Sequence, residues 1–260
     1  MTEYWLFDPA GNVTALIPLA DAAACDTAVA QAVMEAEPTC EQAGFVLPGT
    51  GRCDARLQMA GGEFCGNASL CTAALTALTG GLSVGGSAQL RIAVSGAGEP
   101  VSVTVKRRSE DLFSGSVVMP PVTEIREISL PGADLPAVPV VIMPGICHAF
   151  LPESFGTDRA GSVIRGWCEA LNADAMGVML TDPDFTRLTP LVYVPAVGTL
   201  FRENSCASGT AAFGALLAAR RRSAVELRLR EPGGILSVTA EPDGPVVLCN
   251  TVRLVRRAGI

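Results

Sequence analysis

Two segments of this 260-residue chain resemble each other, and this constrains its fold more than any other feature. In the first, Cys65 is followed by Gly66-Asn67 and an Ala/Leu-rich stretch; in the second, Cys206 is followed by Ala207-Ser208 and another such stretch. In both, the cysteine stands directly before a predicted helix, with Asn or Ser nearby as a capping residue. The repeat predicts two similar lobes, each presenting a cysteine at a helix N-terminus.

Hydrophobic periodicity and chain breakers predict a mixed fold with many short strands and few helices. Helices are expected at Ala22–Met34, Asn67–Thr79, Gly161–Leu171 and Gly209–Arg222. Strands are expected at Glu3–Phe7, Val13–Ile17, Gly44–Leu47, Arg56–Met59, Leu90–Val94, Val101–Arg107, Leu112–Val118, Val138–Met143, Met176–Leu180, Leu191–Val194, Val225–Leu229, Ile235–Ala240 and Pro245–Val252. The proline-rich stretch Leu130–Pro139 is expected to connect the two halves of the chain.

The composition excludes several classes of protein. Hydrophobic residues make up 49% of the chain and charged residues only 17%, which supplies material for cores and argues against disorder. The net charge of −7 is opposite in sign to that of most nucleic-acid-binding domains. No stretch reaches the roughly 18–20 apolar residues of a membrane span, and the N-terminal segment lacks the basic region of a secretory signal. We therefore expect a cytoplasmic protein that binds neither nucleic acid nor membranes.

Cysteine and histidine usage limits the metal chemistry. The nine cysteines are an odd number without C-x-x-C spacing, which favours reduced thiols over a disulfide framework. His148 is the only histidine, so a histidine-based zinc site is excluded, and no metal site is predicted. Besides Cys65 and Cys206, seven cysteines are expected to pack as small hydrophobic side chains: Cys25, Cys40, Cys53, Cys71, Cys147, Cys168 and Cys249.

A cysteine at a helix start suits one kind of chemistry. The N–H groups of the first helical turn favour the thiolate and can also hold a carboxylate. Inverting a carbon next to a carboxylate requires a base on one face and an acid on the other, and a thiolate and a thiol can exchange these roles. Cys65 and Cys206 together therefore indicate general acid–base catalysis at such a carbon.

At these residues the sequence resembles the diaminopimelate epimerase family, the cofactor-independent two-cysteine amino-acid racemases. In chain order the resemblance is carried by Gly11-Asn12, Glu41-Gln42, Gly62-Glu63-Phe64-Cys65-Gly66-Asn67, Gly145-Ile146-Cys147-His148 and Ser205-Cys206-Ala207-Ser208-Gly209. Each motif alone is weak, but all of them in order span nearly the whole chain.

The resemblance implies an α/β (α+β) fold of two pseudo-symmetric lobes. Each lobe is expected to be a curled, mostly antiparallel sheet or barrel around a central helix, with the active site in the cleft between the lobes. The N-terminal lobe is expected to comprise residues 1–118 with the return of residues 250–260, and the C-terminal lobe residues 119–249. The resemblance implies neither pyridoxal phosphate nor a metal. A homodimer is typical of the family.

The resemblance also assigns roles to individual residues. Cys65 and Cys206 become the acid/base pair, and His148 is expected to face the reacting centre near the substrate amino group. Further residues expected to bind the amino-acid substrate are Asn12, Gln42, Gln58, Gly66, Asn67, Glu203, Ala207, Ser208 and Gly209. Of these, Gly66, Asn67, Ser208 and Gly209 are expected to offer backbone N–H groups to the substrate carboxylate, while Glu203, or alternatively Glu41, is a candidate for binding an amino group or an imidazole.

Departures from the family pattern concern the far end of the substrate. Gln58, Ile146 and Ala175 stand about where the family has asparagines for the second head of diaminopimelate, and the Glu-Arg pair before the second cysteine is absent. Unpaired polar groups on a buried distal head would cost about 1–3 kcal/mol each, so diaminopimelate is disfavoured. The short Gly-Gly-Glu-Phe-Cys-Gly-Asn segment and the Ser-Cys pair resemble the histidine racemases of metallophore pathways, which makes histidine the first substrate expected.

Other functions remain open from the sequence. An epimerase acting on hydroxyproline or diaminopimelate, or a double-bond isomerase, would use the same fold. A small-anion binding protein would keep the site without catalysis, although the presence of both cysteines disfavours it. A thiol hydrolase built on Cys147 and His148 is a poor fit, because neighbouring residues in a strand point to opposite faces.

Overall fold

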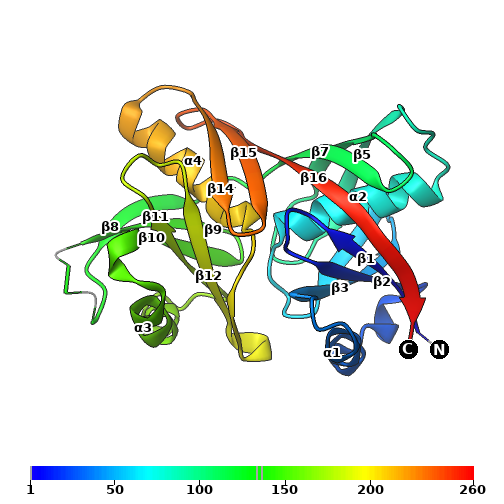
Figure 1. Ribbon diagram of the computed structural model, residues 1–260, viewed down its shortest axis with the longest axis horizontal. Coiled ribbons are helices and arrows are strands. Elements are labelled where there is room, and N and C mark those ends of the chain that lie inside the picture. The colour runs from blue at the N-terminus through cyan, green and yellow to red at the C-terminus, as the bar shows by residue number, and fades with distance from the viewer. Residues whose placement is uncertain (1, 133, 136) are drawn as a thin grey trace. The chain divides into compact units, whose positions relative to one another are not determined.

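The computed structural model describes residues 2–132, 134–135 and 137–260 and divides into two compact units. Unit 1 contains the chain up to Val118 together with Cys249–Ile260, and unit 2 contains Met119–Leu248. Strand β16 (Val246–Gly259) begins in unit 2 and continues into unit 1. The predicted α/β class, with helices enclosed by mostly antiparallel strands, is confirmed (Figure 1).

Unit 1 is a barrel around a buried helix. Its strands are β1 (Glu3–Asp8), β2 (Thr14–Pro18), β3 (Gln42–Pro48), β4 (Ala55–Met59), β5 (Ser87–Val94), β6 (Val101–Arg107) and β7 (Leu112–Val118). They follow one another in the sheet, β7 then pairs with β16, and β16 pairs with β1 and so closes the ring. Helix α2 (Gly66–Thr79) contacts β2, β4, β5, β6 and β7, and α1 (Thr27–Ala36) packs on β2 and β3.

Unit 2 repeats this plan with a sheet that stays open. Its strands are β8 (Glu124–Ile128), β9 (Val138–Met143), β10 (Ile146–Pro152), β11 (Met176–Thr181), β12 (Leu188–Val194), β13 (Thr199–Arg202), β14 (Val225–Glu231) and β15 (Gly234–Ala240). Six strands form a sheet in the order β13-β12-β11-β10-β9-β8, while β14 pairs with β15 and β15 pairs with β16. Helix α3 (Thr157–Ala170) packs on β11 and β12, and α4 (Ala207–Arg221) packs on β14, β15, β9 and β10.

The two central helices are enclosed because their residues are small or apolar on every side. Eleven of the fourteen residues of α2 are buried, and all residues from Ala207 to Ala218 of α4 are buried. A helix that is apolar all round has no face suited to water and is stable only when it is surrounded. Figure 1 shows α2 running behind the strands of unit 1 and α4 lying beside β14 and β15 of unit 2.

The internal repeat extends to the strand pairings. In unit 1, β2 and β3 are parallel neighbours connected through α1, and Thr14 lies opposite Gln42. In unit 2, β10 and β11 are parallel neighbours connected through α3, and His148 lies opposite Gly177. An antiparallel strand follows in both cases, and the central helix comes next in unit 1 and after one further strand, β13, in unit 2. The same connectivity therefore brings both cysteines to equivalent places in their own units.

Several predicted boundaries are wrong for identifiable reasons. The helix expected at Ala22–Met34 is interrupted, because Asp26 turns extended and its side chain caps a new helix that starts at Thr27. Strands β8, β10 and β13 were not expected; β10 lacks an alternating pattern because six of its seven residues are buried. Strand β16 runs well past the expected end at Val252. The predicted helices α2 and α4 agree with the structure within two residues.

The stretch Leu130–Pro139 does not connect the two halves. It lies between β8 and β9, which are both strands of unit 2, and residues 133 and 136 within it lie outside the described residues. Its proline content therefore reflects a loop inside one unit.

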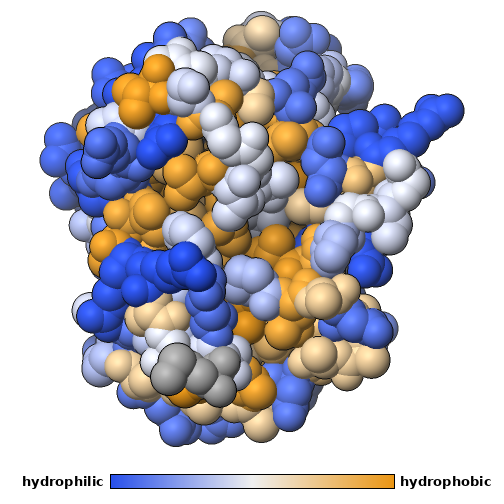
Figure 2. All heavy atoms as spheres, turned by 90° about the vertical axis from the view of Figure 1, so that its right-hand side faces the viewer, coloured by the Kyte–Doolittle hydropathy of each residue, from blue (hydrophilic) through white to orange (hydrophobic). Residues whose placement is uncertain are grey.

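The surface carries both kinds of side chain. Figure 2 shows hydrophobic side chains gathered towards the middle of one face, with hydrophilic side chains around much of its periphery. Within the described residues, no helix has the length and apolar character needed to cross a membrane.

Candidate functional site

Cys65 is the N-cap of α2, and its sulfur takes part in the cap. Its backbone is extended, with φ −132° and ψ 114°, and its Sγ accepts a hydrogen bond from the N–H of Ala68 at 3.3 Å. The segment before it is fixed by Ser95, whose hydroxyl donates to the carbonyl of Glu63 at 3.0 Å. Gly96 allows this close approach, since a Cβ there would come within 2.5 Å of the backbone N of Phe64. The fold therefore holds Cys65 firmly at the helix start.

A network of side-chain amides lies beside this helix start. The Oδ1 of Asn12 accepts hydrogen bonds from Gln42 at 2.6 Å and from Asn67 at 3.1 Å. The amide of Asn12 donates to the carboxylate of Glu41 at 2.6 Å, and the amide of Asn250 donates to Oδ1 of Asn67 at 3.1 Å. The structure thus joins three predicted site residues, Asn12, Gln42 and Asn67, into one group next to Cys65. We call this group with Cys65 the first half-site.

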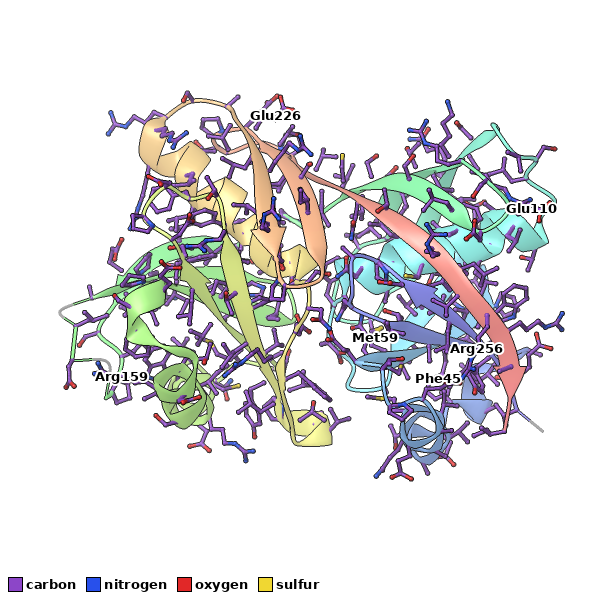
Figure 3. The ribbon with its side chains drawn as sticks, in the orientation of Figure 1. Phe45, Met59, Glu110, Arg159, Glu226 and Arg256 are labelled. Atoms are coloured by element: carbon purple, nitrogen blue, oxygen red, sulfur yellow. The ribbon has the colours of Figure 1, made fainter. Side chains whose placement is uncertain are left out.

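Gln58 does not join this network. It lines a cavity of about 520 Å³ in unit 1, whose walls come from β3, β4, β5 and the segment before α1. Figure 3 labels two of the apolar lining residues, Phe45 and Met59. The Nε2 of Gln58 donates to the carbonyl of Met59 at 3.2 Å.

A buried carboxyl lies two residues before Cys65. The Oε2 atom of Glu63 is buried without a hydrogen-bond partner among the described residues, and burial raises the pKa of this carboxyl.

Cys206 is the N-cap of α4, and its surroundings differ from those of Cys65. The residue is buried, and its Sγ faces the hydroxyl of Ser208 at 3.6 Å. Burial raises the pKa of the Cys206 thiol well above its usual range, and the carboxylates of Glu203 and Glu231 raise it further. The expected lowering by the helix N-terminus is therefore wrong for this cysteine, because loss of water outweighs the N–H groups of the first turn.

Glu231 holds the start of α4. Its carboxyl is buried, with Oε2 accepting from the backbone N–H of Cys206 at 2.6 Å and Oε1 accepting from the hydroxyl of Thr210. Burial raises the pKa of Glu231 to about 8, against the two hydrogen bonds that favour its charged form. The helix N-terminus is thus fixed by a carboxyl that titrates near neutral pH.

His148 lies in the same group. Its ring is fully buried, and Nε2 lies 3.0 Å from the hydroxyl of Ser208. Burial lowers the pKa of His148 to about 3, so the ring is neutral. The ring fits because residue 177 is glycine: a Cβ there would come within 2.3 Å of Nδ1. We call Cys206, Ser208, His148, Thr210 and Glu231 the second half-site.

The alternation of side-chain directions along β10 places Cys147 on the opposite face of the strand from His148. Cys147 packs with Cys168 in the cluster that covers α3, whereas His148 points to the opposite face, towards Ser208 of α4. A Cys147–His148 dyad is therefore excluded by the strand geometry.

The other predicted residues divide into two groups. Gly66, Ala207 and Gly209 lie buried in the first turns of their helices, where the backbone N–H groups have no acceptor within the helix. A Cβ on Gly209 would lie 2.4 Å from Sδ of Met179, so close packing also favours glycine there. Glu203 is partly exposed and acts on the second half-site through its charge on Cys206.

Among the cysteines expected to be core residues, the prediction is partly wrong. All nine cysteines are free thiols, and Cys40, Cys71, Cys147 and Cys168 are buried as expected. Cys249 is exposed, and Cys25 and Cys53 are only half-buried. Cys249 is exposed because it lies on the outward side of β16, between the buried residues Leu248 and Asn250.

Sequence reasoning missed Asn250, Thr210 and Glu231. The one local feature that indicates a role for them is polarity, because each is a polar or acidic residue next to apolar ones in a strand or buried helix. Within the described residues, no group of three or more His, Cys, Asp or Glu side chains is placed to hold a metal ion.

Comparison with solved structures defines the class. The chain superposes on a predicted epimerase from Pseudomonas aeruginosa with a TM-score of 0.71 at 19% identity, covering 100% of this chain and 99% of that one. The protein therefore has the epimerase fold, in which the sequence motifs had placed it.

Sequence comparison defines the family within that class. The model of the histidine racemase CntK N-terminal domain matches residues 2–251. A histidine racemase from Fusobacterium nucleatum is 31% identical over 94% of this chain and 92% of its own length. A histidine racemase from Staphylococcus aureus is 26% identical over 92% of this chain and 88% of its own length. The chain belongs to the histidine racemase CntK family, and the resemblance predicted from the two cysteine motifs is confirmed.

Proposed function

We propose that this protein interconverts L- and D-histidine by a two-base mechanism in which Cys65 and Cys206 exchange protons with Cα. The observation that supports it most directly is the repeated placement of a cysteine as the N-cap of a buried central helix, in a chain of the histidine racemase family.

The proton transfers follow from the chemistry of the two thiols. One cysteine, as thiolate, removes the Cα proton, and the other, as thiol, delivers a proton to the opposite face of the carbon. The carbon inverts and the two cysteines exchange their protonation states. The reverse reaction then starts from the exchanged state, so one pair serves both enantiomers. Positioned general acids and bases contribute about 10²–10⁴-fold each.

The helix starts supply the electrostatic part of the mechanism. Removing the Cα proton moves charge onto the substrate carboxylate, which becomes enolate-like. Backbone N–H groups at the starts of α2 and α4 are donors of the kind that bind a carboxylate and stabilise this charge. Gly66, Asn67, Ser208 and Gly209 occupy those turns. The amide network around Asn12 keeps Asn67 in place in the first half-site.

A chirality-resolved assay in deuterated water tests the proposal. L-histidine incubated with the purified protein and a thiol reductant is expected to give D-histidine carrying deuterium at Cα, with no dependence on added pyridoxal phosphate. The panel includes the other common amino acids, hydroxyproline and diaminopimelate. Absence of both inversion and Cα exchange for every amino acid would contradict a racemase, and inversion of hydroxyproline alone would contradict histidine as the substrate.

We also propose that the protein is a cytoplasmic homodimer. Free thiols at all nine cysteines suit a reducing compartment. A homodimer is typical of the diaminopimelate epimerase family, which the sequence resembles. Sedimentation equilibrium of the purified protein and fractionation of cells that make it test the two statements separately.

A further inference from the structure

The two units hold the segment before their cysteines in different ways. In unit 1, Ser95 directly follows β5 and binds the carbonyl of Glu63 with its neutral hydroxyl. In unit 2, Glu231 ends β14 and binds the backbone N–H of Cys206 with its carboxyl. Both strands follow the central helix of their unit, so the two side chains have comparable structural tasks. Only the one in unit 2 is ionisable.

The carboxyl of Glu231 is close enough to act on the sulfur chemistry. It accepts from the N–H of the very residue that carries the thiol, and both Cys206 and Glu231 are at most 5% exposed. With so little water between them, a negative charge on one opposes a negative charge on the other. The hydroxyl of Thr210 can turn to donate to a carboxylate or to accept from a carboxylic acid, so both states of Glu231 keep a partner.

Few other titratable groups face Cys206. Glu203 does so from the preceding loop, and His148 does so from β10 through Ser208 but is neutral. Strands β9 and β15, which also pack against α4, contain no titratable side chain. Glu231 is therefore the one buried acid among the groups described around this thiol.

We propose that Glu231 is a positioning residue that keeps Cys206 in its thiol form in the free enzyme. This rests on the proposed two-cysteine racemase function. In the favoured state of the free enzyme Cys206 is then the proton donor and Cys65 the thiolate. The exchanged state, from which the reverse reaction starts, is the minor one, and proton exchange with solvent restores the favoured state after each turnover. Activity is lost at high pH when Cys206 loses its proton, and the charge of Glu231 delays that loss.

The pH dependence of kcat/KM for histidine tests this. In the variant Glu231→Gln, the alkaline limb is expected to move to lower pH by about one unit, because the opposing charge is gone. The acidic limb is expected to stay in place, because the substitution leaves the first half-site unchanged. In Glu231→Asp, which keeps the charge, the alkaline limb is expected to return towards its wild-type position even if the maximal rate is lower.

A buried acid elsewhere provides the matched control. Glu37 is also buried, and it binds Tyr4 and Arg256 in unit 1. Glu37→Gln is expected to leave both limbs in place. An unchanged alkaline limb in a folded Glu231→Gln variant, with only the maximal rate reduced, would overturn the proposal and leave Glu231 a structural cap. Retention of full activity by Cys206→Ser would instead overturn the two-cysteine function itself, so the two failures are distinguishable.

Discussion

The two half-sites share a backbone plan and differ in almost every side chain around the cysteine. In the parallel strand pair of each unit, unit 1 places Thr14 opposite Gln42 and unit 2 places His148 opposite Gly177. In unit 1 an amide network that ends at the carboxylate of Glu41 lies beside Cys65, and the buried carboxyl of Glu63 precedes it by two residues. In unit 2 the neighbours of Cys206 are an imidazole and a buried carboxyl.

This difference separates two tasks. The repeated strand–helix connectivity fixes where each sulfur lies, because both cysteines are N-caps of enclosed helices. Burial and the neighbouring carboxyls favour the thiol form of Cys206. An acid/base pair needs one thiolate and one thiol at a time, and two identical half-sites would give no preference for either arrangement. The carboxyl beside Cys206 supplies that preference.

The largest expected effect comes from removing either sulfur. Cys65→Ser and Cys206→Ser are each expected to lower kcat for histidine by about 10²–10⁴-fold, because a hydroxyl is a far weaker acid than a thiol and does not ionise to serve as the base. Chiral chromatography of the products measures the rate in both directions. If both half-sites serve one carbon, each variant loses both directions.

Stability distinguishes this from a loss of folding. Serine is a good N-cap, so both variants are expected to unfold at nearly the wild-type urea midpoint. A variant that kept one direction of racemisation at the wild-type rate would show that the two sulfurs do not act as a pair.

The sequence reveals the parts of the two half-sites that are local in the chain. A cysteine followed by small polar residues and an Ala/Leu-rich stretch is readable as an N-cap because the cap and its helix are adjacent. For the same reason α2 and α4 are predicted within two residues. The motif around His148 predicts its role in the site, but it does not predict that His148 lies on a buried strand.

The partners that complete each half-site come from far along the chain. Glu231 meets Cys206 across 25 residues, and Asn250 meets Asn67 across 183. Such contacts depend on how strands return to the helix, which single-sequence periodicity does not specify. Strand β10 was not predicted for another reason. A strand that is covered on both faces has a continuous apolar sequence without the alternation that identifies a strand.

The pH dependence of stability is the next effect in size, and two groups of the second half-site contribute to it. The pKa of His148 is about 3 in the folded protein and 6.5 in a model peptide, so its contribution is present above pH 6.5 and lost as the pH falls towards 3. The pKa of Glu231 is about 8 when folded and 4.5 in a model peptide, so its contribution is present below pH 4.5 and lost as the pH rises towards 8.

Urea unfolding of the wild type, His148→Gln and Glu231→Gln between pH 4 and 9 measures both contributions. The stability difference between the wild type and His148→Gln is expected to shrink by about 3 kcal/mol as the pH falls from 6.5 to 4. The difference between the wild type and Glu231→Gln is expected to shrink by about 4 kcal/mol as the pH rises from 4.5 to 8. Curves that stay parallel to the wild type would mean that neither group changes its pKa on folding.

A smaller effect is expected where unit 2 has glycine and unit 1 has glutamine. Gly177→Ala places a Cβ 2.3 Å from Nδ1 of His148 and 2.6 Å from Cε of Met179, so the ring must leave Ser208. We expect a loss of about 1–3 kcal/mol in the free energy of unfolding. Gly166→Ala is the control, since it lies exposed in α3 and a Cβ there meets nothing within 4 Å. It should gain about 0.5–1 kcal/mol, and equal behaviour of the two variants would show that the ring tolerates displacement.

The smallest effect tests the amide network of the first half-site. Asn250→Ala removes the hydrogen bond to Oδ1 of Asn67, which is buried beside the start of α2. We expect about 1 kcal/mol of lost stability and a KM for histidine raised a few-fold with little change in kcat, because Asn67 loses orientation while both sulfurs stay in place. Thr251→Ala, an exposed neighbour on β16, is expected to change neither quantity. A fall in kcat at unchanged KM would instead mean that the network acts on the proton transfers. The side chains of the first half-site would then influence the cysteine chemistry, as those of the second half-site are proposed to do.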